Sequence, residues 1–245
     1  MTLPVAPMAL PAADDDNGGQ FTTHHVVDTH VRGKALSVVY MNDPVSVESS
    51  IQTMEQFLAE DKYRVVGFDL EYTIGRAGHD QKVAVAQLCV RHDVLVYHFH
   101  LATRPCERFS RFIKSSDYNF ATVDTTNDLK ALKVSGLKCP NLVNIQDHYK
   151  VWCSNNNKLN SLVDLASAII DPYYMKMKNE SNKDRNAWHS VWHKRLDEQH
   201  VKYAAMDAYT SYEMYMRIID MRNCLLPDSD EGLSHIAVAG ASQEV

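Results

Sequence analysis

Hydrophobic residues along the chain follow two spacings: alternation, typical of strands, and intervals of three or four residues, typical of helices. Strands are predicted over residues 25–27, 36–40, 64–71, 83–90, 94–99, 119–123 and 141–145. Helices are predicted from Asp43-Pro44 to about Leu58, over residues 105–113, 128–134 and 159–170, and from Asp197 to about Cys224. A hairpin followed by alternating strands and helices predicts an α/β or α+β domain, with a mixed central β-sheet flanked by helices in three layers.

The composition changes at both ends of the chain. Residues 1–21 are rich in proline, alanine, aspartate and glycine, and residues 225–245 are small and acidic. Such segments bury too little apolar surface to fold, so both are expected to be disordered. Residues 22–224 are then predicted to form one globular domain. The first residues also lack the basic region of a secretory signal, so secretion is not expected.

The overall composition narrows the classes of function. The chain has 245 residues, of which 45% are hydrophobic and 23% charged, as in soluble globular proteins. Its net charge of -6 argues against a protein that coats DNA through general electrostatics. No apolar run reaches the roughly 18 residues of a membrane helix, so no membrane partner is expected. Five scattered cysteines, with neither disulfide nor zinc-site spacing, suit a reducing compartment such as the nucleus or cytoplasm: Cys89, Cys106, Cys139, Cys153 and Cys224.

The strongest candidate for chemistry is the predicted strand that ends at Glu71. Residues two apart on a strand share a face, so Asp69 and Glu71 point one way, and Phe68 and Leu70 point the other. Two neighbouring carboxylates repel each other and are costly to bury, and a divalent cation with oxygen ligands removes both costs. Taken alone, such a pair is more often a strand that becomes polar where it reaches solvent.

Two further aspartates are candidates for the same chemistry. Tyr203 and Asp207 are four residues apart in an alanine-rich part of the last predicted helix, so they share one helix face. Asp128 opens a short predicted helix. Helix capping and the helix dipole both favour an aspartate in that position, so nothing local requires a catalytic role for it.

Together these motifs resemble those of a known family. Phe68–Thr73 (FDLEYT), Val83–Val90 (VAVAQLCV), the downstream Asp128 and Tyr203–Tyr209 (YAAMDAY) follow the order of the exonuclease motifs of the DEDD superfamily. The resemblance is greatest to Werner-syndrome-type 3′–5′ exonuclease domains, in particular the small plant forms, and it spans about residues 25–222. It implies an RNase H-like α/β fold. The tyrosine four residues before the last aspartate, Tyr203, resembles the residue that marks the tyrosine subclass of this superfamily.

The resemblance implies a metal-dependent 3′–5′ exonuclease that releases nucleoside 5′-monophosphates by a two-metal mechanism. Asp69 would bridge two Mg2+ or Mn2+ ions. Glu71 and Asp207 would complete the site for the ion that binds the attacking water, and Asp128 would hold the other ion. Tyr203 would orient the water or help to deprotonate it. Leu70 and Tyr72 would contact a single-stranded 3′ end of DNA or RNA.

The sequence departs from the family pattern at two places. Tyr72 stands where Werner-type domains usually carry tryptophan, although an aromatic ring is kept. Thr122 and Asp124 stand where glycine is expected in the second motif, which makes Asp124 an alternative to Asp128 as the ligand. A non-catalytic nucleic-acid-binding scaffold of the same fold is therefore one alternative. An exoribonuclease that trims small RNAs is another, and related plant enzymes can form rings, which leaves a homo-oligomer open.

Other notable residues have simpler explanations. Trp188 and Trp192 are expected in the core, His200 at the surface, and His98 and His100 in structural or exposed positions. The basic stretch 176–185 is expected to be a solvated loop rather than a binding site for nucleic acid. A helicase or RNA-processing partner would have to be a separate chain, because neither module accompanies the domain.

Overall fold

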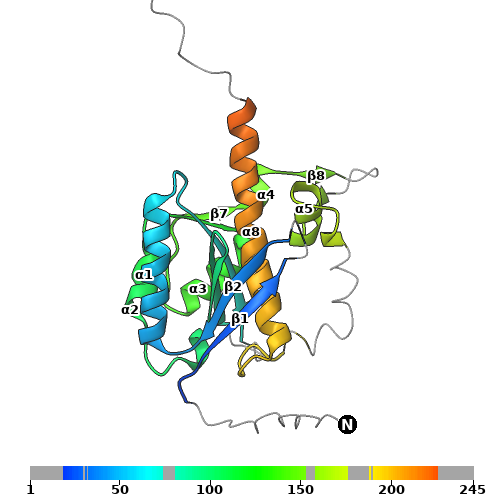
Figure 1. Cartoon of the computed structure of the whole chain (residues 1–245). Coiled ribbons are helices and arrows are strands. Elements are labelled where there is room, and N and C mark those ends of the chain that lie inside the picture. The colour runs from blue at the N-terminus through cyan, green and yellow to red at the C-terminus, as the bar shows by residue number, and fades with distance from the viewer. Residues whose placement is uncertain are drawn as a thin grey trace, which may run out of the picture.

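A seven-stranded mixed sheet forms the centre of the protein (Figure 1). This computed structural model describes residues 19–29, 31, 33–73, 81–152, 158–175, 188 and 190–225. The strands are β1 (Thr22–Asp28), β2 (Ala35–Met41), β3 (Val65–Tyr72), β4 (Val83–Val90), β5 (Asp93–Tyr97), β6 (Asn119–Thr122) and β7 (Leu142–Asn144), in the order β1-β2-β5-β4-β3-β6-β7. β3 lies between β4, to which it is antiparallel, and β6, to which it is parallel, so the predicted mixed sheet is confirmed.

The helices cover both faces of this sheet. They are α1 (Pro44–Glu60), α2 (Glu107–Lys114), α3 (Thr125–Val134), α4 (Ile145–His148), α5 (Leu162–Ile169) and α8 (Glu198–Leu225), with a 3-10 turn at Phe99–Leu101. Two short strands, β8 (Val151–Trp152) and β9 (Lys158–Leu159), form a separate pair. Asp43 caps α1, with Pro44 in its first turn, and the Asp197 side chain accepts from the backbone N–H of His200 at the start of α8, both as predicted.

Two of the predicted boundaries differ from the observed ones at the start of α5 and at the end of β5. The helix predicted over 159–170 begins at Leu162, because Ser161 caps it and shares a reciprocal capping box with Asp164. The strand predicted over 94–99 ends at Tyr97. His98 follows it, is buried, and its Nδ1 lies 2.8 Å from the Tyr40 hydroxyl, which makes it the structural residue that was expected.

The alternation along β3 separates two hydrophobic cores. Val66, Phe68 and Leu70 pack with residues of α1, α2 and α3 on one face. Val65 packs with residues of α5 and α8 on the other face. Asp69 and Glu71 follow Val65 in phase, so the face of β3 that carries the carboxylates is the one that α8 covers.

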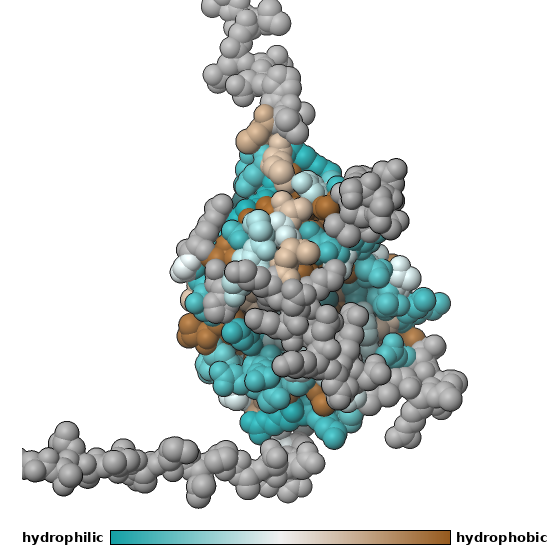
Figure 2. Space-filling model, turned by 90° about the vertical axis from the view of Figure 1, so that its right-hand side faces the viewer, coloured by the Kyte–Doolittle hydropathy of each residue, from teal (hydrophilic) through white to brown (hydrophobic). Residues whose placement is uncertain are grey.

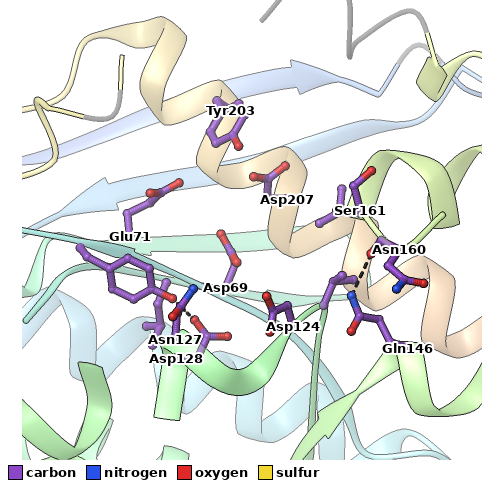
Figure 3. A pocket seen from close by; sticks show the side chains of 14 residues that line it. Asp69, Glu71, Asp124, Asn127, Asp128, Gln146, Asn160, Ser161, Tyr203 and Asp207 are labelled. Carbon is purple, nitrogen blue, oxygen red and sulfur yellow. Dashed lines mark hydrogen bonds between the residues drawn. The ribbon is translucent and has the colours of Figure 1, made fainter. Parts of the chain in front are cut away.

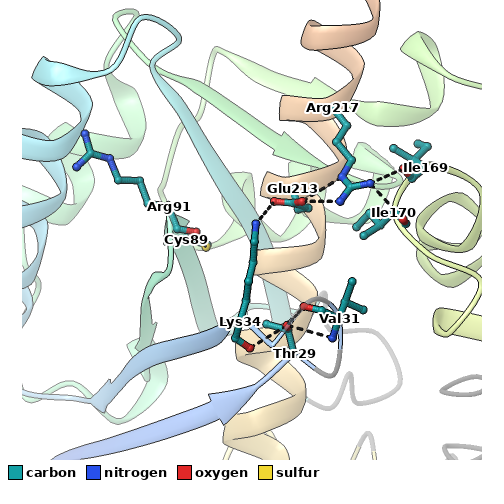
Figure 4. A network of polar contacts seen from close by, with 9 residues as sticks. All are labelled: Thr29, Val31, Lys34, Cys89, Arg91, Ile169, Ile170, Glu213 and Arg217. Carbon is teal, nitrogen blue, oxygen red and sulfur yellow. Dashed lines mark hydrogen bonds and ion pairs between the residues drawn. The ribbon is translucent and has the colours of Figure 1, made fainter.

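A polar network fixes α8 against its neighbours (Figure 4). Arg217 donates to Glu213 one turn earlier on α8, and to the carbonyl oxygens of Ile169 and Ile170 at the end of α5. Lys34, beside the turn between β1 and β2, lies 3.6 Å from the other oxygen of Glu213. The network therefore joins the hairpin, α5 and α8, and holds the helix that carries Tyr203 and Asp207.

On the face seen in Figure 2, the coloured residues are mostly hydrophilic, with small hydrophobic patches among them. The most exposed large hydrophobic residues lie on different elements: Val26 on β1, Val45 on α1 and Leu129 on α3. None of the described helices is both long and apolar enough to span a bilayer. Cys89, Cys106, Cys139 and Cys224 are free thiols, while Cys153 lies outside the described residues.

Candidate active site

The carboxylates predicted from the sequence line one open cavity of about 520 Å³ beside the end of β3 (Figure 3). Its walls come from β3, the start of α3, α4, the start of α5, and α8. The labelled lining residues in Figure 3 are Asp69, Glu71, Asp124, Asn127, Asp128, Gln146, Asn160, Ser161, Tyr203 and Asp207. Among the described residues that line the cavity, none is lysine or arginine.

Asp69, Glu71 and Asp207 form a cluster with metal-ligand geometry. Each offers a carboxylate oxygen, and these oxygens all lie within 4.8 Å of one another. Asp69 and Glu71 point from the same face of β3, as their spacing predicts, and Asp207 approaches from α8 (Figure 3). The donor set consists of oxygen atoms alone, which suits a hard cation such as Mg2+ or Mn2+ better than zinc.

Gly67 makes this approach of α8 to β3 feasible. A Cβ atom at this position would lie 2.1 Å from the Ala208 carbonyl oxygen and 2.6 Å from the Tyr212 Cβ. Helix and strand backbones are therefore close enough that no side chain fits between them. Ala208 follows Asp207 directly, so this contact sets the distance between Asp207 and the β3 carboxylates.

Asp128 lies in the same cavity, but on another element. α3 begins at Thr125, three residues earlier than predicted, because Asp124 rather than Asp128 caps it. The Asp124 side chain accepts from the backbone N–H of Thr126, and its φ is +62°, in the left-handed region. Asp128 is 2% exposed and accepts hydrogen bonds from the hydroxyl groups of Tyr72 and Thr122. Capping therefore does not explain Asp128.

The carboxylates raise one another's pKa values. Burial, then the charges of Asp207, Glu71 and Asp128, raise the pKa of Asp69 well above its usual value. Burial raises the pKa of Asp128 to about 6 and that of Asp207 to about 7, although hydrogen bonds from tyrosine hydroxyls oppose both shifts. Such repulsion is what a bound divalent cation would relieve, so the residues present fit a metal centre.

Tyr203 lies one helical turn before Asp207 and faces the same cavity (Figure 3). The charge of Asp207, followed by burial, raises the pKa of the Tyr203 hydroxyl. The phenol therefore stays protonated and serves as a hydrogen-bond donor. Trp188 and Trp192 pack against its ring at centroid distances of 5.9 and 6.1 Å, and Trp192 is 1% exposed, as expected for a core residue.

The expectation that His200 lies at the surface was wrong. Its side chain is buried because Trp188 stacks on its ring at 3.9 Å and Asp197 lies 2.8 Å from its Nδ1. The helical spacing between His200 and Asp207 could not predict this burial, because the residue that covers His200, Trp188, lies outside α8. His200 therefore belongs to the packing behind Tyr203.

The two residues expected to contact substrate differ in their surroundings. Leu70 is 3% exposed and packs in the core formed with α1, α2 and α3. Tyr72 is half-buried, and its hydroxyl donates a hydrogen bond to Asp128. Both border the cavity, and their contact with substrate stays a prediction. The basic stretch 176–185 and most of the loop after Tyr72, residues 74–80, lie outside the described residues.

Sequence reasoning missed several neutral polar residues of the cavity. Asn127 precedes Asp128 directly, and Asn160 and Ser161 are polar residues at the start of the helix predicted over 159–170, so a signal for these three was present. Gln146, whose side-chain amide donates to the Asn160 carbonyl oxygen at 2.8 Å, had no sequence signal. It enters the cavity because β7 and α4 bring it to the edge of the sheet.

Comparisons with known proteins found a matching family and solved structures of similar fold. Residues 44–221 match a family described as 3′-5′ exonuclease. No curated protein matches the chain significantly. The fold is similar to the Aedes aegypti Nibbler EXO domain, with a TM-score of 0.54 and 15% identity over 76% of this chain and 89% of that one.

Two further solved structures share the fold. Escherichia coli RNase D, titled an exoribonuclease involved in structured RNA processing, has a TM-score of 0.55 and 14% identity over 76% of this chain and 45% of that one. Trypanosoma brucei RNase D in complex with RNA U12 has a TM-score of 0.50 and 14% identity over 72% of this chain and 66% of that one. At these identities the likeness concerns the fold, and it confirms the predicted class.

Proposed function

Because the chain belongs to the 3′-5′ exonuclease family, we propose that it is an active, metal-dependent exonuclease that removes nucleotides from the 3′ end of nucleic acid. The observation that carries the proposal is the meeting of Asp69, Glu71 and Asp207 within 4.8 Å, with Asp128 in the same cavity. A catalytically impaired scaffold has no need for three carboxylates that repel one another in this way.

Asp69, Glu71 and Asp207 would hold one divalent cation, and Asp128 together with Asp69 would hold a second. When bound, Mg2+ or Mn2+ supplies Lewis-acid activation of water and neutralises charge on the phosphate. The cavity lining described above contains no basic side chain for that neutralisation, which supports a role for cations.

Tyr203 would orient the attacking water. Its protonated hydroxyl donates a hydrogen bond, and its ring is fixed between Trp188 and Trp192. The proton of the water would pass to solvent or to a carboxylate, since a phenol that stays protonated accepts none. The products are a nucleoside 5′-monophosphate and a chain one nucleotide shorter with a new 3′-hydroxyl.

We place the protein with the Werner-type, tyrosine-subclass enzymes on its motif pattern, and in the nucleus or cytoplasm. The proposed substrate is a single-stranded 3′ end of DNA or RNA. Leu70 and Tyr72, which border the cavity, would contact it. Trypanosoma brucei RNase D was solved with RNA, so an exoribonuclease is the second candidate. The two differ in whether the site requires the 2′-hydroxyl.

The test uses 5′-labelled single-stranded RNA, single-stranded DNA and a recessed duplex, each with Mg2+ and with Mn2+. We expect a ladder that shortens from the 3′ end, and a loss of more than about 100-fold in Asp69→Asn and Asp207→Asn. Asp220→Asn is the matched control, because Asp220 is an exposed aspartate on the same helix as Asp207. Wild-type protein that shortens no substrate with either metal would contradict the proposal.

A further inference from the structure

Two hydroxyl groups meet the Asp128 carboxylate, one on each oxygen. The Tyr72 hydroxyl donates to Oδ1, and the Thr122 hydroxyl donates to Oδ2 at 3.3 Å. Thr122 is fully buried and Asp128 is 2% exposed, so water has little access to replace either donor. Among the described residues no cation pairs with this carboxylate, and both of its oxygens are held by neutral donors.

The donors come from neighbouring strands, and the carboxylate comes from the helix that follows them. β3 and β6 run parallel, with Gly67 opposite Ala121, so their carboxyl ends lie at the same edge of the sheet. Tyr72 is the last residue of β3 and Thr122 the last of β6, and α3 begins three residues after Thr122. The sheet edge therefore fixes the direction in which Asp128 points.

Both donors stand at positions where the sequence departs from the family pattern. Glycine at position 122 would supply no side-chain donor, and a tryptophan at position 72 would carry its N–H elsewhere on a larger ring. The two departures therefore act on one carboxylate.

We propose that Tyr72 and Thr122 are a pair of positioning residues that orient Asp128 as a ligand of the second divalent cation. This inference rests on the proposed function, which supplies the cation. Outer-shell hydrogen bonds fix the orientation of ligand carboxylates, and their loss costs about 10–100-fold in metal affinity or activity. Glu71 and Asp207 bind the other ion, so removing the hydroxyls leaves that ion in place.

The test measures Mn2+ binding to the full chain by calorimetry and by electron paramagnetic resonance. Two ions are expected for the wild type. Tyr72→Phe and Thr122→Val remove one hydroxyl each with little change of shape, and each weakens the weaker ion about 10–100-fold while the tighter ion is unchanged. Thr122→Ser keeps a hydroxyl and restores binding, and Asp128→Asn abolishes the weaker ion.

Tyr97→Phe is the matched control, because the Tyr97 hydroxyl is buried but has no hydrogen-bond partner among the described residues. It is expected to bind Mn2+ as the wild type does. A wild type that binds two ions, with Tyr72→Phe and Thr122→Val indistinguishable from it, would overturn this inference and leave the nuclease intact. A wild type that binds no Mn2+ would overturn both proposals.

Discussion

The two sides of the metal site are built in different ways. On one side, Asp69, Glu71 and Asp207 are brought together by backbones, because β3 and α8 cross in contact at Gly67. On the other side, Asp128 is directed by the side chains of Tyr72 and Thr122. Geometry set by a backbone crossing depends on one small residue, whereas geometry set by hydroxyl groups can be changed one hydrogen bond at a time.

This difference predicts how each side responds to mutation. Damage at the crossing should affect stability and the whole site together, because the same contact supports the core and the carboxylates. Damage at the hydroxyl groups should affect one cation and leave the fold intact.

The largest effect is expected from Gly67→Ala. The new Cβ would lie 2.1 Å from a backbone oxygen of α8, so the helix must move away from β3. Overpacking of this kind costs about 3 kcal/mol or more of unfolding free energy. It also separates Asp207 from Asp69, so Mn2+ binding should be lost. Thermal unfolding and calorimetry check the two effects.

Gly136→Ala is the control for Gly67→Ala. It replaces a glycine that has no close backbone neighbour. Gly136 has a positive φ of +71° with nothing within 4 Å of a new Cβ, so the expected cost is only about 1 kcal/mol, from backbone strain. Mn2+ binding should be unchanged in this variant. Equal effects from the two substitutions would contradict the role of Gly67 in placing Asp207.

The same difference between the two sides of the site decides how much of it can be predicted from the sequence. The period of two on β3 and the spacing of four on α8 are local patterns, so the faces of Asp69, Glu71, Tyr203 and Asp207 could be read directly. Asp128 was identified by family resemblance, but its hydroxyl partners could not be. Tyr72 and Thr122 are 50 residues apart in the chain, and only the pairing of β3 with β6 brings them together.

The fold itself was predictable for a similar reason. Most strands and helices follow from local periodicity, and the mixed sheet follows from their order. The errors occurred where a side chain outside the predicted element, or a competing cap, decided the outcome. Asp124 moved the start of α3, Ser161 moved the start of α5, and Trp188 buried His200.

The second largest effect is expected from pH, because burial raises the pKa values of the carboxylates. The folded-state pKa values of Asp128 and Asp207, about 6 and 7, lie above the usual value near 4. Between about pH 4 and pH 7 the folded protein therefore binds more protons than the unfolded chain. Without metal, its stability falls as pH rises through this range. A bound cation removes this loss. The gain in Tm from Mn2+ over EDTA should therefore increase by about 5–10 °C from pH 5 to pH 8.

Comparing Mn2+ with EDTA at each pH cancels other titrating groups. Buried His98 is one of these, because burial lowers its pKa to about 3 and so favours folding at higher pH. In Asp207→Asn the increase with pH should be smaller, since this variant lacks the carboxyl group whose pKa is about 7. An Mn2+ gain that stays constant from pH 5 to pH 8 would contradict the raised pKa values of the buried carboxylates.

A smaller effect is expected where α8 is anchored far from the cavity. Arg217→Ala removes charged hydrogen bonds to Glu213 and to the carbonyl oxygens of Ile169 and Ile170. The expected cost is about 1–2 kcal/mol of unfolding free energy. Chemical denaturation measures it. The control is Arg222→Ala, which removes a single exposed contact, to His148, from the same helix. Nuclease activity below the unfolding temperature should remain, because the crossing at Gly67 is unchanged.

The smallest effect is expected from Asp124→Asn, and it decides which aspartate of the second motif is the ligand. Asparagine also tolerates the left-handed φ of +62° and can accept from the Thr126 N–H, so unfolding free energy should change by less than about 0.5 kcal/mol. Asp124 is exposed and caps α3, whereas Asp128 is buried with both oxygens oriented. Calorimetry should therefore still find two Mn2+ ions in Asp124→Asn and one in Asp128→Asn. The reverse result would transfer the ligand role to Asp124, and the hydroxyl pair would then be holding a carboxylate that binds no metal.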